Sequence, residues 1–155
     1  MEIFDKYNIL LASASFRRRE LLAQLGIRYT LVKSPLEEEI IPKDLPVENA
    51  SEYLARCKSL AYNDLKNRDL LITADTTVII DDKILGKPKD YSEACQMLKL
   101  LSNKTHLVVT GVCLRSADKE KCFSVVTEVT FSELHDEEIR YYVEKFKPYD
   151  KAGAY

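Results

Sequence analysis

Three consecutive arginines, Arg17–Arg19, stand at the predicted start of a helix, shortly after Ser13 and Ser15. Either serine can cap this helix by accepting a backbone hydrogen bond in its first turn. Cations are unfavourable there because the helix dipole is positive at its N-terminus, at a cost of roughly 0.3–1 kcal/mol each. Unpaired backbone N–H groups and three cations at one helix start instead favour the docking of an anion. We therefore expect an anionic ligand here, with Arg17 and Arg18 as its main contacts.

Asp75 is the acidic residue with the most apolar surroundings in the sequence. We predict that it lies at the end of a strand over residues 70–80, where a carboxylate is costly to desolvate unless a cation or a metal compensates it. Ligands of open α/β sheets gather next to such strand ends. Lys58 lies at the border of an apolar helix stripe, so its ammonium can either reach solvent or turn inward. Lys87 follows a short hairpin that could return it towards Asp75.

The acidic run 37–39 adds further carboxylates, although its charge alone does not decide which of them enters a site and which is a solvated edge. Carboxylates combined with lysines and arginines suit a divalent metal ion together with a polyphosphate. The cations neutralise phosphate charge, while the carboxylates hold the metal or activate water. The residue types therefore indicate metal-assisted hydrolysis of a phosphoanhydride.

Other kinds of chemistry find little support in the sequence. It contains no Gly-x-Gly-x-x-Gly, no Walker-type phosphate loop, no His-Glu-x-x-His and no Gly-x-Ser-x-Gly, and it has only two histidines. A net charge of −2 argues against a general nucleic-acid or membrane-surface binder. None of the four cysteines forms a Cys-x-x-Cys pair, so we interpret them as small apolar core residues. No apolar run approaches the ~20 residues of a membrane span, and we expect a cytoplasmic protein.

Hydrophobic periodicity and turn residues predict the elements that position these side chains. Strands are expected at residues 9–11, 28–32, 70–80, 83–85, 107–115 and 121–131, the last two as an antiparallel hairpin. Helices are expected between residues 15 and 26, over residues 50–65, between residues 90 and 103, and from residue 136 onward. In the first helix Leu21, Leu22 and Leu25 should anchor one face, and in the second Asn49 and Glu52 should form a capping box.

Four segments together resemble the Maf family of nucleoside triphosphate pyrophosphatases. They are Leu-Ala-Ser-Ala-Ser-Phe-Arg-Arg-Arg-Glu-Leu-Leu from residue 11, Ala-Asp-Thr-Thr-Val from residue 74, Ile-Leu-Gly-Lys-Pro from residue 84 and Asp-Lys-Ala-Gly-Ala-Tyr from residue 150. The resemblance spans the whole chain in the order and spacing of the family. It implies an α/β fold related to the inosine-triphosphate pyrophosphatases, with an elongated mixed sheet flanked by helices. It also implies cleavage of a nucleotide between its α and β phosphates with a divalent cation, Mg²⁺ or Mn²⁺.

The resemblance also implies roles for particular residues. Asp75 matches the proton acceptor, and Glu38, Lys58 and Lys87 match further catalytic positions. We expect Asp75 and Glu38 to hold the metal ion. Two further pairs match substrate-binding positions, namely Ser13 and Arg18 on the phosphate side, and Arg17 and Thr76 at positions linked to base preference. Arginine and threonine there are similar to the branch that acts on dTTP and UTP, rather than the branch that prefers 7-methyl-GTP.

Two features depart from the family pattern. Phe16 stands where the family usually has proline, and the family continues after Tyr155 with Gly-Ile-Gln and further strands. We therefore expect one Maf-like domain over residues 1–155 that lacks the C-terminal segment of the family. The alternatives are a housekeeping hydrolase of other non-standard nucleotides and a non-catalytic nucleotide-binding regulator of cell division. The expected partner is the nucleotide, without nucleic acid or membrane, and the resemblance suggests a homodimer.

Overall fold

The computed structural model describes residues 4–36 and 39–155. Its backbone forms two compact units, each of two chain segments: unit 1 comprises Met1–Asp75 and Thr110–Ser124, and unit 2 comprises Thr76–Val109 and Val125–Tyr155. The described residues contain no helix that is long and apolar enough to cross a membrane.

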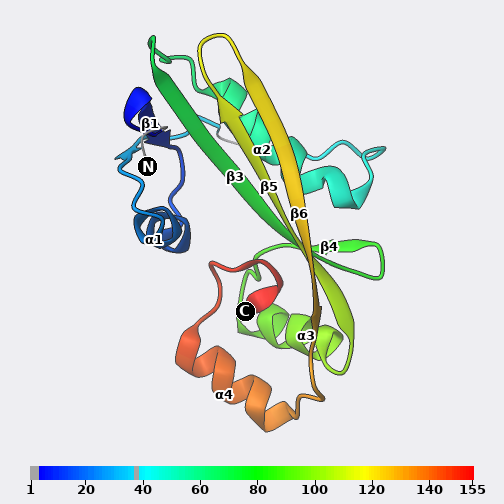
Figure 1. Cartoon of the computed structure of the whole chain (residues 1–155). Helices are drawn as coiled ribbons and strands as arrows, with labels where there is room; N and C mark the ends of the chain where they lie inside the picture. Colours follow the sequence, from blue (N-terminus) through cyan, green and yellow to red (C-terminus); the bar gives the residue numbers. More distant parts are fainter. Residues whose placement is uncertain (1–3, 37–38) are drawn as a thin grey trace. The chain divides into compact units, whose positions relative to one another are not determined.

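Six strands pair into a mixed sheet in the order β2-β1-β3-β5-β6, with β4 on β3 (Figure 1). They are β1 (Asn8–Leu11), β2 (Thr30–Leu31), β3 (Asp69–Ile80), β4 (Lys83–Leu85), β5 (Thr105–Arg115) and β6 (Glu120–Thr130). β1 runs parallel to both β2 and β3, whereas β4 is antiparallel to β3. The predictions of a mixed α/β fold and of the β5–β6 hairpin are confirmed, although the strand expected at residues 28–32 has only two residues.

Unit 1 begins with a short 3₁₀ helix, η1 (Phe4–Lys6), which is followed by the strand, loop and helix that the sequence predicts. Helix α1 (Phe16–Gln24) has Ser15 as its N-cap, whose Oγ accepts from the backbone N–H of Arg18 at 3.5 Å. Gly26 follows the helix at φ +69°, a left-handed conformation that glycine adopts without strain. The predicted anchoring face is wrong, because Leu21 and Leu25 are more than half exposed and α1 has no buried residue.

Helix α2 (Ala50–Ala61) packs closely against β5. An added Cβ at Gly111 of β5 would lie 2.3 Å from the backbone of Ser51 and Glu52, so only glycine permits this approach. Arg115, four residues after Gly111 at the end of β5, reaches the C-terminal turn of the helix, where its guanidinium donates to Ser59 Oγ at 3.0 Å and to the carbonyl of Ser59 at 2.5 Å.

Two details of α2 differ from the prediction. The helix ends at Ala61 instead of residue 65, and the carbonyls of its last turn are bonded by Arg115. The capping box is absent, because Asn49 makes no side-chain cap hydrogen bond. Asn49 is instead the last residue of a short 3₁₀ helix, η2 (Val47–Asn49). Its backbone is therefore helical, and its side chain does not cap α2.

Unit 2 is built on α3 (Tyr91–Leu101), α4 (Asp136–Phe146) and the short η3 (Ala152–Ala154). Helix α3 begins where the sequence predicts, with Asp90 as its N-cap, whose side chain accepts from the backbone N–H of Glu93 at 2.8 Å. The apolar faces of α3, α4 and η3 meet in one cluster of buried residues, which comprises Ala94, Met97, Leu98, Ile139, Val143 and Ala154.

A second group of contacts in unit 2 fixes the segment Lys151–Tyr155. The N–H of Gly153 donates to the carbonyl of Gly86 at 3.0 Å. Tyr155 Oη lies 2.6 Å from Nε2 of the buried His106, and both rings pack edge-on against Phe131. These contacts tie the chain at Gly86, next to Lys87, to a segment more than sixty residues further along.

Candidate functional site

Asp75 lies in the interior of β3, not at the end of the strand as the sequence analysis predicts. Its side chain is 12% exposed, and the strand continues for five residues beyond it. A buried carboxylate inside a sheet is unfavourable unless nearby cations compensate it. The neighbours of Asp75 in unit 1 supply that compensation.

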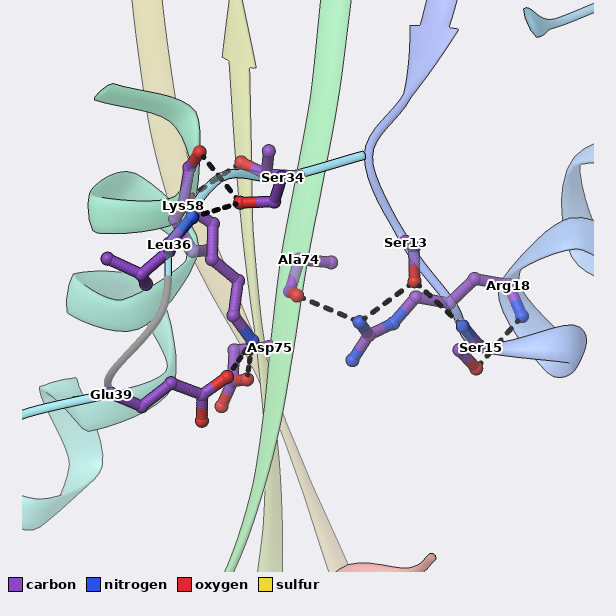
Figure 2. Close-up of polar contacts among 11 residues, drawn as sticks. Ser13, Ser15, Arg18, Ser34, Leu36, Glu39, Lys58, Ala74 and Asp75 are labelled. Atoms are coloured by element: carbon purple, nitrogen blue, oxygen red, sulfur yellow. Dashed lines mark hydrogen bonds and ion pairs between the residues drawn. The ribbon is translucent and has the colours of Figure 1, made fainter. Parts of the chain in front are cut away.

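Lys58 turns inward from α2 and joins two carboxylates. Its Nζ lies 2.5 Å from Asp75 Oδ1 and 2.6 Å from Glu39 Oε1 (Figure 2). The lysine side chain is 17% exposed, so of the two directions that the sequence left open, the structure shows the inward one. The carbonyl of Lys58 also accepts from Ser34 Oγ at 3.4 Å, which links α2 to the segment before Glu39.

Arg18 reaches the residue next to Asp75 from the other side of β3. One guanidinium nitrogen donates to the carbonyl of Ala74 at 2.8 Å and to Ser13 Oγ at 3.4 Å (Figure 2). Ser13 Oγ also accepts from the N–H of Ser15 at 3.2 Å, so the turn before α1 and the arginine support each other. Arg18, at the start of α1 where we expect an anion to bind, therefore reaches the residue next to Asp75.

Burial and charge act against each other in this cluster. Desolvation raises the pKa of Asp75 above its ordinary value, and the charges of Lys58 and Arg18 partly offset that rise. The pKa of Arg18 is lowered, mainly by burial, while Asp75 and Glu39 act in the opposite direction. A carboxylate with a raised pKa beside two cations is a suitable proton acceptor for a reaction that develops negative charge.

The structure thus brings four of the predicted site residues into one cluster of unit 1, namely Ser13, Arg18, Lys58 and Asp75. Arg17 is exposed on the first turn of α1. Glu38 lies outside the described residues, so the metal ligand predicted there is not described.

Two predicted site residues belong to unit 2. Thr76 is half-buried on β3, and Lys87 is exposed in the segment after β4. The buried Pro88 follows Lys87 directly, and the carbonyl of Gly86 before it accepts from Gly153. The lysine is therefore carried on a short segment that is held at both ends.

Sequence reasoning missed two contributors to the site. Glu39 belongs to an acidic run whose members could not be distinguished by charge, and only its ion pair with Lys58 singles it out. The carbonyl of Ala74 has no side-chain signature at all, although it anchors Arg18.

A hollow of about 510 Å³ is lined by residues 33–36. Its size falls within the range of small-molecule sites. Ser34 lines this hollow, and its hydroxyl donates to the backbone carbonyl of Lys58 on α2.

The donor set of the cluster fits a hard divalent cation. The Asp75 and Glu39 oxygens both contact one ammonium group, which puts them within about 5 Å of each other. Carboxylate oxygens are the ligands that Mg²⁺ and Mn²⁺ prefer. The carboxylates of Asp75 and Glu39 already hold one positive charge, the ammonium of Lys58, so a cation is favoured between them.

Comparison of the sequence with known proteins gives a consistent set of relatives. A family model described as Maf-like protein matches residues 8–155. A dTTP/UTP pyrophosphatase of Phocaeicola vulgatus is 50% identical over 156 residues, which cover 100% of this chain and 81% of the relative. Proteins of the same name from Porphyromonas gingivalis and Flavobacterium psychrophilum are 50% and 43% identical. Those matches cover 100% and 98% of this chain, and 79% and 78% of the relatives.

Solved structures agree on the fold. The Ham1 protein of Staphylococcus aureus matches with a TM-score of 0.50 at 15% identity, over 83% of this chain and 72% of that one. A HAM1 protein from Coxiella burnetii gives the same TM-score and identity over 79% of this chain and 71% of that one. At this identity the likeness concerns the fold alone.

Proposed function

Because the chain belongs to the Maf-like protein family, we propose that it is a nucleoside triphosphate pyrophosphatase that hydrolyses dTTP and UTP to the monophosphate and pyrophosphate. The relatives that carry the name dTTP/UTP pyrophosphatase support this substrate choice. The observation that carries the chemistry is the buried Asp75 carboxylate, held by Lys58 and flanked by Arg18.

In the proposed reaction Asp75 is the proton acceptor. It takes a proton from the attacking water while the water oxygen bonds to the α-phosphorus. The bond from that phosphorus to the oxygen bridging it to the β-phosphate then breaks, and pyrophosphate leaves. Burial supports this role, because a carboxyl with a raised pKa is a stronger base when ionised.

The cations around Asp75 stabilise the charge of the polyphosphate. Arg18 is anchored on Ala74 and can direct its remaining N–H groups to phosphate oxygens, a geometry for which guanidinium groups are well suited. Ser13 can donate its hydroxyl hydrogen to the same phosphates. Lys58 offsets negative charge beside the base, and we assign Lys87 the same role towards the phosphates.

A divalent cation, Mg²⁺ or Mn²⁺, when bound, would polarise the phosphate oxygens and help to form the nucleophile. We assign its protein ligands to Asp75 and to the glutamate run. Glu38 is the glutamate that matches a catalytic position of the family, and Glu39 is the one whose carboxylate pairs with Lys58. Separate Glu38→Gln and Glu39→Gln variants distinguish the two by their metal requirement.

The proposal is tested by pyrophosphate release with Mg²⁺ or Mn²⁺ on a panel of dTTP, UTP, dITP and 7-methyl-GTP. We expect turnover to be highest on dTTP and UTP, and Asp75→Asn to lose about 10²–10⁴-fold in kcat. The matched control is Asp136→Asn, because Asp136 is an exposed acid of α4 and should not affect turnover. Near-normal turnover of Asp75→Asn would refute its role as the base. Nucleotide binding without pyrophosphate release would favour the non-catalytic regulator.

The base preference is assigned to Arg17 and Thr76 on the basis of the family resemblance. Arg17→Met and Thr76→Ala should each change the ratio of kcat/KM for dTTP to that for dITP, while leaving the fold intact by circular dichroism. An unchanged ratio in both variants would remove these residues from base recognition.

A further inference from the structure

Two cysteines that are nine residues apart in the chain face each other across the β5–β6 hairpin. The Cys122 thiol donates to Cys113 Sγ at 2.8 Å. We propose that Cys113 and Cys122 form an oxidisable pair that closes into a cross-strand disulfide when the protein meets a low-molecular-weight disulfide. This covalent modification site belongs to unit 1 and is separate from the Asp75 cluster.

The register of the hairpin places the two cysteines directly opposite each other. At its tip the N–H of Ser116 donates to the carbonyl of Lys119 at 2.8 Å, which makes these two residues a hydrogen-bonded pair. Pairs alternate along an antiparallel ladder, so three steps back Cys113 and Cys122 form a non-hydrogen-bonded pair. The Cα atoms of such pairs are about 4.5 Å apart, within the 4.4–6.8 Å that a disulfide spans.

The surroundings favour a neutral cross-link. Cys113 is fully buried, whereas Cys122 is half-buried and accessible to a reagent. Burial, together with the adjacent thiol of Cys113, raises the pKa of Cys122 to about 12. The Cys122 thiol is therefore protonated at neutral pH, and a disulfide joins the two sulfurs without creating a buried charge.

A metal centre is the competing possibility, because Glu120 lies close enough to complete a three-ligand group with the two cysteines. Two observations argue against it. The sulfur separation of 2.8 Å is shorter than the roughly 3.7 Å that two thiolates adopt on a tetrahedral zinc ion with Zn–S bonds of ~2.3 Å. The carboxylate of Glu120 is also already paired with Arg56 at 2.7 Å.

The reaction balances in two exchange steps. Cys122 loses its proton, and its sulfur attacks the reagent disulfide, which forms a mixed disulfide and releases one thiolate. The Cys113 sulfur then loses its proton and attacks Cys122 Sγ, which forms the cross-strand bond and releases a second thiolate. Two protein thiols are oxidised by two electrons, and one reagent disulfide is reduced to two thiols.

The test uses 4,4′-dithiodipyridine on the folded protein for several hours, because the raised pKa makes the first step slow. Trypsin cleaves after Lys104, Arg115, Lys121 and Arg140, so the two cysteines fall on the separate peptides 105–115 and 122–140. We expect these peptides to be joined in mass spectra recorded without reductant, at two hydrogens below their summed mass, and separated by dithiothreitol. Cys95→Ser is the matched control and should retain the link, whereas Cys122→Ser should lose it.

A second readout does not depend on peptide mapping. The oxidised protein should melt about 5–10 °C higher than the reduced one, and dithiothreitol should reverse the shift, because the bond closes a short loop of the unfolded chain. A stable pyridyl adduct on Cys122 with Cys113 still reduced would overturn the proposal. Retention of one zinc ion per wild-type chain after dialysis, lost in Cys122→Ser, would also overturn it in favour of a metal centre.

Discussion

Replacing Lys58 by methionine should destabilise the protein in a way that depends on pH. Methionine keeps most of the length of the lysine stem but removes the charge that compensates Asp75, whose side chain is only 12% exposed. Removal of one partner of a buried ion pair typically costs about 3–5 kcal/mol, because the other charge is left uncompensated.

Protonation of Asp75 limits this loss. Neutralising a carboxyl with an unfolded-state pKa of 3.8 costs about 1.36 kcal/mol for each pH unit above that value, or about 4.4 kcal/mol at pH 7 and about 1.6 kcal/mol at pH 5. In the folded variant the pKa of Asp75 exceeds the unfolded value. The variant is therefore most stable below the pKa of Asp75 in the unfolded state. Its free energy of unfolding falls as the pH rises from there through the pKa of Asp75 in the folded state. We expect Lys58→Met to lose about 3 kcal/mol at pH 7 and no more than about 1.6 kcal/mol at pH 5.

Urea unfolding followed by circular dichroism at the two pH values measures this difference. The double variant Lys58→Met/Asp75→Asn carries no ionisable group at either position, so the pH dependence introduced by Lys58→Met should disappear. Lys99→Met is the control, because Lys99 and Asp136 form an exposed pair in unit 2 and its loss should not change the unfolding free energy measurably. A loss from Lys58→Met that is equal at both pH values, or as small as that of the control, would refute this account.

Two further predictions concern a buried histidine of unit 2 and a close-packed glycine of unit 1. Burial lowers the pKa of His106, so its neutral form is favoured in the folded state. The stability that neutral His106 contributes is therefore complete above pH ~6.5 and is lost as the pH falls towards the pKa of His106 in the folded state. Thermal melts between pH 5 and 7.5 should show this decline in the wild type and a flatter profile in His106→Phe, and parallel profiles would contradict it. Gly111→Ala should cost about 1–3 kcal/mol or more in urea unfolding, because its Cβ would meet the α2 backbone at 2.3 Å. Gly86→Ala has nothing within 4 Å of its Cβ and should be close to neutral, so equal effects of the two variants would contradict the packing argument.

Local signals in the sequence predicted most elements of the fold. The apolar run before Ser13, the serine cap and Gly26 were sufficient for β1, α1 and its end, since each depends on neighbouring residues alone. The same approach failed for the burial of α1, because spacing shows which leucines share a face but not what packs against it. Leu21 and Leu25 share the predicted face, yet both are exposed.

The candidate site was predicted less completely, because its charges come together through long-range contacts. Asp75 was selected for its apolar surroundings, yet its position inside β3 is tolerated only because Lys58 and Arg18 reach it from distant segments. The pairing of Cys113 with Cys122 is a similar case. The hairpin was predicted from its alternating pattern, but the facing of the two sulfurs depends on a register that only the turn hydrogen bond defines.

The discontinuity of unit 1 has a consequence for the order in which the protein can fold during synthesis. Its first segment ends at Asp75, within β3, but β3 pairs with β5, and only residues 110–115 of β5 belong to the second segment of this unit. The parallel pairing of β1 with β3 also joins residues about sixty positions apart. Contacts of such long sequence separation form slowly because the intervening chain must be ordered first. A nascent chain that has exposed only residues 1–75 therefore carries Lys58 on α2 and Asp75 on a sheet that still lacks β5, so unit 1 can be completed only after the β5–β6 hairpin has emerged.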